Sequence, residues 1–418
     1  MGIVVTGIGA VTPVGIGREA TWDSLTEGRN GVDKITLFDP KAYGLQVEID
    51  AEVKDWDPKI HTNWVHAKDL RYQHRSAQFA GYATYEARKQ AGLVRFPKSK
   101  KPYDVVNLVG TGGGGSDRYE EMTRAVDSRK SILPSQLIQS IYNSVLSSIA
   151  KTTEHDQAFP ISTACATGAD SAAVATRFLL STNDVVPCEV SYVGGTEAAI
   201  SATSIKSFDG IRALSTRSDP ETASRPFSLG RDGFVMGEGA VVAILESERF
   251  ARKRGAKPLA RMIGWSSICR PGDPTRPSLD DIVETMNRSI RQANISAKDI
   301  DLIIAHGTST PINDLAETNA IKRVFGECAY KIPITAPKSM VGHMMGAGGA
   351  LNILVAVQSL VTGIVPPTIN YIPDPECDLD YVPKFARRVE PRRVMVDAFG
   401  FGNQNCCLIF ELFEDWRI

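Results

Sequence analysis

Short apolar runs and longer amphipathic runs alternate along almost the entire chain. The apolar runs are rich in β-branched residues and predict strands at 3–11, 105–112, 158–163, 189–195, 260–268, 301–307, 394–402 and 406–414. The amphipathic runs have helical spacing and predict helices at 135–150, 168–180, 279–294, 314–325 and 346–361. Alternation of this kind is typical of α/β proteins whose mainly parallel or mixed sheets are buried on both faces.

The two halves of the chain share one local arrangement. In each half a buried strand ends in a turn of small residues that carries a reactive side chain, and a helix follows. ISTACATGAD (161–170) has this form in the first half and IIAHGTSTPIND (303–314) has it in the second. This similarity indicates a duplication. A charged helix end that runs into Gly and Pro at 248–258 predicts a boundary between residues 1–255 and 256–418.

Length and composition narrow the class of protein. A chain of 418 residues exceeds what one ordinary core usually holds, so two domains or a duplicated unit are expected. A formal net charge of −1 gives no overall attraction to nucleic acid or to an anionic membrane, so a charged partner must bind at a local patch. The most apolar stretch, 351–367, is interrupted by polar residues and is too short to predict a transmembrane span.

One of the seven cysteines lies in an unusual setting. The cysteines are scattered without a CxxC pair, which argues against a disulfide framework and favours a reducing cytoplasm. Cys165 falls at a strand-to-helix turn among small residues, where a helix N-terminus is expected to lower the pKa of a thiol. This setting predicts a nucleophile. The alternative is a buried structural cysteine, which is the commoner case for a lone cysteine.

Two histidines lie in comparable turns. His306 ends the apolar run DLIIAH, and His343 lies between a strand-like run and a Gly-rich helix start. Catalytic residues of α/β proteins gather at the carboxyl ends of strands, so we expect both histidines near Cys165. Cysteine and two histidines are also legitimate zinc ligands, but Lys338 five residues before His343 disfavours a second cation there.

The stretch GTGGGG (110–115) satisfies the G-x-G-x-x-G pattern of a dinucleotide-binding loop. That fingerprint also requires an acidic residue at the end of a second strand about 20 residues further on. The following stretch is instead charged and helical. A nicotinamide-dependent dehydrogenase is therefore a weak alternative, and the glycines are expected to make room for another group.

These residues together resemble the β-ketoacyl-acyl carrier protein synthases of the thiolase fold. The resemblance extends over nearly the whole chain and rests on VVTGIGAVTPVG (4–15), TACATG (163–168), SRPFSLGRDGFVMGEGA (224–240), HGTST (306–310), KSMVGHMMGAGG (338–349) and AFGFG (398–402). Four further stretches are most similar to the ketosynthase alpha subunits of bacterial type II polyketide synthases: ITLFDP (35–40), HRSAQFA (74–80), KSMVGH (338–343) and PDPECDLDYVP (373–383). HGTSTP is more similar to the fatty-acid branch.

The resemblance implies a fold, an activity and a set of partners. The fold is α/β and thiolase-like, with duplicated halves that form a five-layered αβαβα core. The activity is decarboxylative condensation of malonyl-acyl carrier protein with an acyl chain held on cysteine, without metal or organic cofactor. The partners are acyl carrier protein and a second subunit, either a chain-length factor in a heterodimer or another copy in a homodimer.

The resemblance also implies roles for single residues. Cys165 is the nucleophile, His306 and His343 act on the malonyl thioester, and Lys338 and Glu317 support them. Asp314 is the family aspartate that follows HGTST and is counted with the catalytic residues. Phe401 is the gate, and its N–H joins that of Cys165 in the oxyanion hole. Gly113, Phe399 and Phe401 line the acyl pocket. Lys68, Arg71 and Arg75 follow helical i, i+3, i+7 spacing and are expected to dock the carrier protein.

The sequence departs from the family pattern at three places. Asn403 and Gln404 follow the gate where glycines are usual, Gly113 stands where fatty-acid enzymes commonly have a bulky aliphatic residue, and His74 replaces an aspartate. Three alternatives remain open: a polyketide ketosynthase, a housekeeping fatty-acid elongation enzyme, and a non-catalytic chain-length factor. The intact Cys165 argues against the last.

Overall fold

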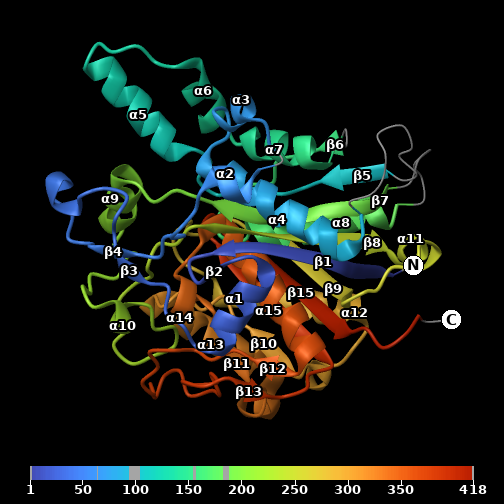
Figure 1. The fold of residues 1–418 in the computed structure, drawn as a ribbon. Helices are drawn as coiled ribbons and strands as arrows, with labels where there is room; N and C mark the ends of the chain where they lie inside the picture. The colour runs from blue at the N-terminus through green and yellow to red at the C-terminus, as the bar shows by residue number, and fades with distance from the viewer. Residues whose placement is uncertain (1, 64, 94–103, 154–156, 182–187, 417–418) are drawn as a thin grey trace.

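The computed structural model describes residues 2–63, 65–93, 104–153, 157–181 and 188–416, and in this part of the chain eleven strands form one mixed sheet (Figure 1). The strand order is β11-β10-β14-β15-β9-β1-β8-β7-β5-β6, and β2 pairs with β1 alone. The strands of this sheet are β1 (Ile3–Thr12), β2 (Gly15–Ile16), β5 (Asp104–Asn107), β6 (Gln157–Ala158), β7 (Cys188–Glu197), β8 (Gly239–Ser247), β9 (Ala260–Cys269), β10 (Leu302–Ile304), β11 (Ile334–Thr335), β14 (Arg393–Gly400) and β15 (Gln404–Leu412). Two short ribbons pair β3 (Asp33–Lys34) with β4 (Ile49–Asp50) and β12 (Ile364–Val365) with β13 (Arg387–Arg388).

The two halves of the sheet repeat one topology. In the first half the order is β6-β5-β7-β8-β1, and in the second it is β11-β10-β14-β15-β9, which is the same order when each half is numbered from its own first strand. In both halves the first three strands are parallel and the last two pair antiparallel. The halves meet where β1 pairs antiparallel with β9. The predicted duplication is therefore confirmed at the level of strand order.

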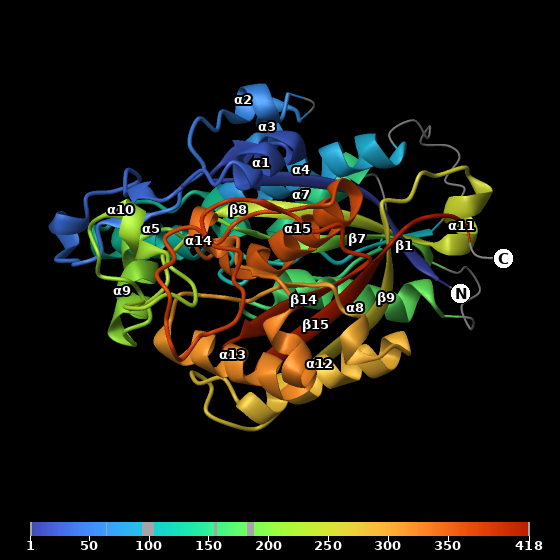
Figure 2. The ribbon, with the colours of Figure 1, turned by 90° about the horizontal axis from the view of Figure 1, so that it is seen from below.

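Helices cover both halves of the sheet and fill the space between them (Figure 2). On the first half, α4 (Arg75–Ala91) packs on β1 and β8, with α7 (Ser144–Thr153) against it. On the second half, α12 (Leu279–Ala293) packs on β9 and β15, with α13 (Pro311–Phe325) against it. Between the halves, α8 (Thr167–Leu179) and α15 (Gly348–Thr362) contact strands of both. These are the five layers of the predicted αβαβα core.

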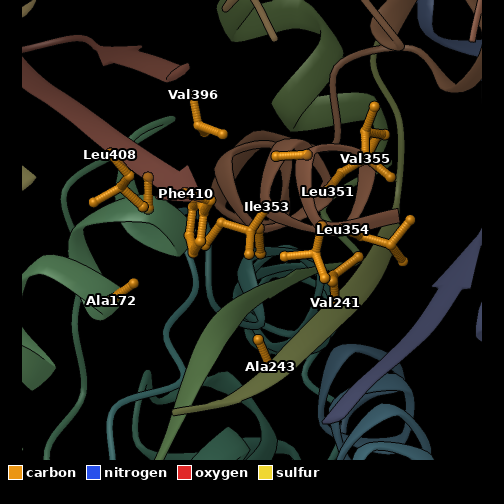
Figure 3. Packing of buried hydrophobic residues seen from close by; sticks show 14 of the residues in the cluster. Ala172, Val241, Ala243, Leu351, Ile353, Leu354, Val355, Val396, Leu408 and Phe410 are labelled. Carbon is orange, nitrogen blue, oxygen red and sulfur yellow. The ribbon is translucent and has the colours of Figure 1, made fainter. Parts of the chain in front are cut away.

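The central helix α15 is apolar on every face because it is surrounded by protein. Leu351, Leu354 and Val355 are fully buried, and they lie between Val241 of β8 and the β14–β15 pair (Figure 3). By length and composition alone, the segment Met345–Thr362 could cross a membrane, which corrects the expectation that this region is too short. Because 83% of that segment is buried inside the protein, it has the character of a core helix.

The structure corrects which turns are equivalent in the two halves. The Cys165 turn follows β6 and leads into α8, and the segment with His343 follows β11 and leads into α15. These are the corresponding positions of the repeat. HGTST (306–310) follows β10, whose counterpart is β5, so it corresponds to the glycine loop at 110–115. The predicted equivalence of ISTACATGAD with IIAHGTSTPIND is therefore wrong, although both stretches are strand-turn-helix units.

Several predicted elements differ in extent, and the strand expected at 301–307 is limited to Leu302–Ile304. The helix expected at 135–150 is two helices, α6 (Pro134–Ser140) and α7, because Ile141 is extended (φ −84°, ψ 143°). The strand expected at 158–163 is limited to Gln157–Ala158, and Pro160 beyond it has no N–H to offer a ladder. The strand expected at 105–112 ends at Asn107.

The remaining helices are α1 (Arg18–Thr26), α2 (Pro58–His61), α3 (Ala67–Leu70), α5 (Ser116–Asp127), α9 (Ala202–Gly210), α10 (Pro220–Ala223), α11 (Glu248–Lys253) and α14 (Lys338–Val341), with 3₁₀ turns η1 (Pro40–Tyr43), η2 (Ala297–Asp299), η3 (Gly326–Tyr330) and η4 (Met345–Ala347).

Two substitutions on α15 test the importance of the central layer. Leu354→Ala removes a fully buried side chain from between the two halves of the sheet, and we expect a loss of about 2–5 kcal/mol in the free energy of unfolding. Val361→Ala is the matched control, because Val361 lies on the same helix with 49% of its surface exposed, and it should change stability by less than about 0.5 kcal/mol. Urea denaturation followed by circular dichroism measures both. Equal losses would contradict the assignment of α15 as the buried layer.

Candidate active site

A cavity of about 330 Å³ brings the predicted cysteine and both histidines together. Cys165 lies beyond β6, His306 beyond β10 and His343 beyond β11, so each follows the carboxyl end of a parallel strand. Phe399 and Phe401 line the same cavity. Both histidines therefore lie near Cys165, as expected, and the two phenylalanines expected at an acyl pocket lie in the same cavity.

The backbone around Cys165 is held in a tight, partly strained turn. Ala164 has a φ of +50°, which is unusual for a residue with a Cβ. Thr167 stabilises this turn, because its hydroxyl accepts the N–H of Thr163 at 2.9 Å and donates to the carbonyl of Ala164 at 2.7 Å. The helix α8 then begins directly after the turn, which places the thiol of Cys165 at its N-terminal end.

The end of β14 passes close to this turn. A Cβ on Gly400 would lie 2.8 Å from the carbonyl oxygen of Thr163 and 3.1 Å from the nitrogen of Cys165, so only glycine allows this approach. The backbone N–H groups of Phe401 and of Cys165 itself both interact with the thiol and act to lower its pKa. These are the two donors that the family resemblance implies for an oxyanion hole, and both lie close to the sulfur.

The thiol of Cys165 is nevertheless protonated in the free protein. Burial raises its pKa to about 12, and the nearby Glu197 adds to this, whereas the charge of Lys338 and the two backbone donors oppose it. The expectation that the helix N-terminus makes Cys165 a thiolate is therefore wrong. The loss of solvent around a fully buried sulfur outweighs the favourable dipole.

The two imidazoles pack edge to face at the wall of the cavity. Their ring centroids are 5.6 Å apart with an interplanar angle of 85°, and both rings are buried. Burial lowers both pKa values well below 6.5, and the charge of Lys338 lowers them further. Among the described residues, Nδ1 of His306 and both ring nitrogens of His343 have no hydrogen-bond partner. The site therefore presents two neutral imidazoles with unused hydrogen-bonding capacity.

Lys338 and Glu317 hold the backbone that carries His306. Nζ of Lys338 donates to the carbonyl of His306 at 2.5 Å. The carboxylate of Glu317 accepts the N–H of His306 at 2.7 Å and that of Gly307 at 2.8 Å. Burial lowers the pKa of Lys338 and raises the pKa of Glu317, and each charge partly offsets the effect on the other. The pair fixes the position of His306 from both sides of one peptide.

Asp314 organises the remainder of the HGTST loop. Its carboxylate accepts the N–H groups of Thr308 at 3.0 Å, Ser309 at 3.1 Å and Phe227 at 2.8 Å. Ser309 has a φ of +72°, a strained conformation that these bonds help to maintain. Asp314 thus contacts the loop rather than the cavity, and its effect on the site is positional.

The glycine loop at 110–115 binds a carboxylate of the protein itself. Glu197, at the end of β7, accepts the N–H groups of Gly112 at 2.9 Å, Gly113 at 3.1 Å and Gly346 at 3.1 Å. Thr111 donates a further hydrogen bond at 3.0 Å. The amides that a phosphate would need are already occupied, which removes the basis for the dinucleotide alternative. Burial raises the pKa of Glu197, and no pattern in the local sequence indicated this role.

Gly113 does not line the cavity that contains Cys165. A Cβ at this position would lie 3.1 Å from the Cβ of Ala199 and 3.2 Å from the carboxylate of Glu197. Its φ is not in the left-handed region, whereas that of Gly114 is +59°. The absence of a side chain at Gly113 therefore allows its close contact with Glu197. The prediction that Gly113 lines the acyl pocket is wrong if that pocket is the cavity that contains Cys165.

The three residues expected to dock the carrier protein do not share a helix. Lys68 lies on the short helix α3, Arg71 follows it, and His74 caps a new helix that begins at Arg75. The guanidinium of Arg75 donates to the buried carboxylate of Glu238 at 2.8–3.1 Å, so Arg75 is a structural residue and its predicted helical spacing is wrong. Lys68 and Arg71 are exposed and remain candidates.

His74 and four lining residues received no role from the sequence. His74 is buried, with Nε2 2.8 Å from a carboxylate oxygen of Asp117 in α5. Phe234 packs edge-on against His343 at 5.2 Å, and Phe208 stacks on the exposed Phe401 at 6.4 Å. Arg212 and Arg276 line the outer part of the cavity. Phe234 lies within the motif 224–240, which was the only available signal.

In the described ranges, no group of three or more His, Cys, Asp or Glu residues is arranged to hold a metal ion. The zinc alternative for Cys165, His306 and His343 therefore has no geometric support in this part of the chain.

Comparison with known proteins identifies the family. The model of the β-ketoacyl synthase N-terminal domain matches residues 1–251, and that of the C-terminal domain matches residues 260–372. The chain belongs to the β-ketoacyl synthase family. It is an acyltransferase-type condensing enzyme, and its thiolase-like fold is confirmed by solved structures. Ketosynthases of this family take substrates on the phosphopantetheine of acyl carrier protein and need no separate cofactor.

Similar ketosynthases come from two biosynthetic settings. The 3-oxoacyl-[acyl-carrier-protein] synthase 2 of Coxiella burnetii is 38% identical over 97% of both chains, and that of Synechocystis is 37% identical over 99% of this chain and 98% of its own. Among solved structures, the ishigamide ketosynthase/chain length factor has a TM-score of 0.88 at 29% identity over 99% of both chains. The type II ketosynthase AntDE in complex with its acyl-carrier protein AntF has a TM-score of 0.87 at 30% identity, again over 99% of both chains.

The protonated state of Cys165 predicts its reactivity with alkylating reagents. Because its pKa is about 12, the thiolate fraction should rise about tenfold per pH unit from pH 7 to pH 10. Iodoacetamide labelling of the Cys165 peptide, measured by mass spectrometry, should follow that slope without a plateau. The exposed Cys269 serves as the internal reference. A plateau near pH 7 would show that the ketosynthase stores the thiolate and would contradict the dominance of burial.

Proposed function

We propose that this ketosynthase accepts an acyl chain from a carrier-protein thioester on Cys165 and condenses it with malonyl-acyl carrier protein by decarboxylation. The observation that carries the proposal is that two neutral imidazoles, His306 and His343, line the same cavity as the thiol of Cys165. A neutral imidazole carries one N–H group, and that group can donate a hydrogen bond to a thioester oxygen.

The acylation step uses the donors beside Cys165. The thiol attacks the thioester carbonyl, its proton passes to the departing pantetheine sulfur, and the C–S bond to the carrier breaks. The N–H groups of Cys165 and Phe401 stabilise the oxyanion that forms. Because the thiol is protonated at rest, the proton needed by the leaving group is already present in the site.

The condensation step uses the histidines. The carboxylate carbon of the malonyl group leaves as CO₂, and its bonding electrons form an enolate whose oxygen accepts hydrogen bonds from His306 and His343. The nearby Lys338 adds positive charge in a region of low dielectric. The enolate carbon then attacks the acyl group on Cys165, the C–S bond breaks, and the sulfur leaves as a thiolate, which takes up a proton from solvent to regenerate the resting thiol. The product carries a β-keto group and is two carbons longer.

We place this activity in type II polyketide biosynthesis. The likeness to the ishigamide and AntDE ketosynthases over nearly the full chain supports this placement. Fatty-acid elongation is the second candidate, because the curated relatives at 35–38% identity are 3-oxoacyl-[acyl-carrier-protein] synthases. The two pathways differ in chain reduction, so preference for an unreduced over a saturated acyl chain separates them.

A second subunit is supported by an exposed apolar surface. Helices α5 and α6 project from the body of the protein (Figure 1). Large apolar side chains on and beside these helices are 51–62% exposed, namely Tyr119, Val126, Leu133 and Leu137. A surface of this kind marks an interaction site. We propose that it is covered in a dimer, with a chain-length-factor subunit in the polyketide setting or a second copy in the fatty-acid setting.

The division of labour between thiol and imidazoles predicts different defects. His306→Ala and His343→Ala should each slow malonyl decarboxylation by about 10²–10³, because each removes one donor to a developing oxyanion. Acylation of Cys165 should be affected much less. Cys165→Ala is the complementary variant, which should lose condensation while retaining slow decarboxylation. Release of labelled CO₂ and the mass of the acyl-enzyme measure the two steps, and lost acylation with intact decarboxylation in the histidine variants would refute the assignment.

Docking of the acidic carrier protein is proposed at Lys68 and Arg71. Reversing both charges with Lys68→Glu and Arg71→Glu should raise the Michaelis constant for carrier-bound substrate, most strongly at low salt. Small thioester mimics should be unaffected. The matched control reverses Lys298 and Lys331, which are exposed on the other half of the protein. Equal effects on carrier-bound and small substrates would place docking elsewhere.

A further inference from the structure

Glu197 is a fully buried acidic residue close to the active site, and the proposed chemistry leaves it without a role. It is the last residue of β7, and none of its surface is exposed. Its carboxylate accepts hydrogen bonds from the N–H groups of Gly112, Gly113 and Gly346 and from the hydroxyl of Thr111. Glu197 does not line the cavity that contains Cys165, so any part that it plays in the reaction is indirect.

The ionised form of Glu197 fits this set of partners. The hydroxyl oxygen of Thr111 accepts the N–H of Gly114 at 3.0 Å, which leaves the hydroxyl hydrogen free to donate to Glu197. All the partners are therefore donors, and a protonated carboxyl would bring its own O–H against one of them. Burial raises the pKa of Glu197, and these hydrogen bonds oppose the rise. Together the donors hold a buried negative charge in a fixed position.

The bond to Gly346 joins Glu197 to the turn that carries His343. Gly346 lies three residues after His343, in the 3₁₀ turn η4 that leads into α15. Its N–H donates to Oε2 of Glu197 at 3.1 Å. The other end of the turn is held separately, because the N–H of His343 donates to the carbonyl of Val235 at 2.7 Å and its carbonyl accepts the N–H of Gly237 at 2.9 Å. The turn is thus anchored at both ends, and Glu197 anchors the end next to α15.

The repeated fold shows why this anchor bears on the reaction. Strands β7 and β14 occupy the same place in the two halves of the sheet. The end of β14 approaches the Cys165 turn at Gly400, and this contact brings a backbone N–H close to the thiol. The end of β7 approaches the His343 turn at Gly195, where a Cβ would lie 2.0 Å from the carbonyl oxygen of Gly346. The corresponding contact in the first half therefore fixes the turn that carries the imidazole.

We infer that Glu197 is a positioning residue, which holds the His343 turn in place for decarboxylation of the malonyl thioester through its hydrogen bond with Gly346. This inference rests on the proposed function, because it requires that His343 acts on the enolate. The charge of Glu197 has a different effect on acylation, since it adds to burial in raising the pKa of the Cys165 thiol. Loss of the carboxylate should therefore slow one step of the reaction and spare the other.

The test replaces Glu197 with glutamine, which has a similar size but carries an NH₂ group that cannot accept a hydrogen bond. Release of labelled CO₂ from malonyl-acyl carrier protein measures decarboxylation, and the mass of the acyl-enzyme measures acylation of Cys165. We expect Glu197→Gln to lower kcat for decarboxylation by about 10–10², the effect of a small displacement of a catalytic group. KM should not change, because Glu197 lies outside the cavity. Acylation should keep its rate or become faster.

Thr111→Val is the matched control. Valine has nearly the shape of threonine, and the substitution removes one donor to the same carboxylate while it keeps the charge and the bond to Gly346. Both steps should therefore change much less than decarboxylation does in Glu197→Gln. An equal and selective loss of decarboxylation in Thr111→Val would attribute the effect to the glycine loop and would overturn the inferred role of Gly346.

The ratio of the two steps decides the outcome. Equal losses in both steps, or unchanged decarboxylation, in a Glu197→Gln protein with an unchanged circular dichroism spectrum would overturn the proposal. If that variant does not fold, Glu197→Asp takes its place, because it keeps the charge and shortens the reach to Gly346. A selective loss of decarboxylation in Glu197→Asp supports the proposal, and equal losses or none overturn it.

Failure of the proposed function gives a separate result. In that case the unaltered protein releases no CO₂ from malonyl-acyl carrier protein and forms no acyl adduct on Cys165. An active unaltered protein whose two steps keep the same ratio in the Glu197 variants contradicts only the inference about Glu197.

Discussion

The contact between α8 and α15 is the constraint on which the active site depends. A Cβ on Gly168 would lie 2.6 Å from the backbone nitrogen of Ala350, and a Cβ on Gly349 would lie 2.8 Å from that of Ala169. The two helices can therefore touch backbone to backbone only because these positions lack side chains. Since the Cys165 turn leads into α8 and the His343 turn leads into α15, this contact sets the distance between thiol and imidazole. The two halves of the sheet stabilise the contact by burying the remaining faces of both helices.

Burial is the second general influence, and it favours the neutral form of the thiol and of both imidazoles. It keeps the thiol of Cys165 protonated and both imidazoles neutral. The free enzyme thus carries little charge at the reacting atoms, although Lys338 and Glu317 lie close behind them. Charge appears only as the reaction proceeds, at oxygens that face fixed donors, and a low dielectric strengthens those interactions at that moment.

The sequence was sufficient for features that depend on local pattern. Strand-turn-helix units placed Cys165, His306 and His343 at the carboxyl ends of strands, and parallel strands bring those ends to one edge. It was insufficient where the outcome depends on contacts between distant segments. Glu197 accepts hydrogen bonds from Gly112, which lies 85 residues before it in the chain, and from Gly346, which lies 149 residues after it. No local sequence pattern indicates contacts between segments so far apart. The pKa of Cys165 was predicted with the wrong sign because the depth of burial cannot be obtained from a turn sequence. Arg75 was wrongly predicted to share one helix with Lys68 and Arg71, because His74 caps a new helix that begins at Arg75.

The repeated strand order has a consequence for how the catalytic groups are distributed. Cys165 and His343 lie in corresponding turns of the two halves. His306 lies in the loop that corresponds to the glycine loop at 110–115. An ancestral half-length protein that paired with itself would have had the same turn twice, in a symmetric site. In the present chain the corresponding positions have diverged. The first half supplies the cysteine that carries the acyl group, and the second supplies the histidines that stabilise the carbanion. Neither half contains all the catalytic groups, so the active site lies where the two halves meet.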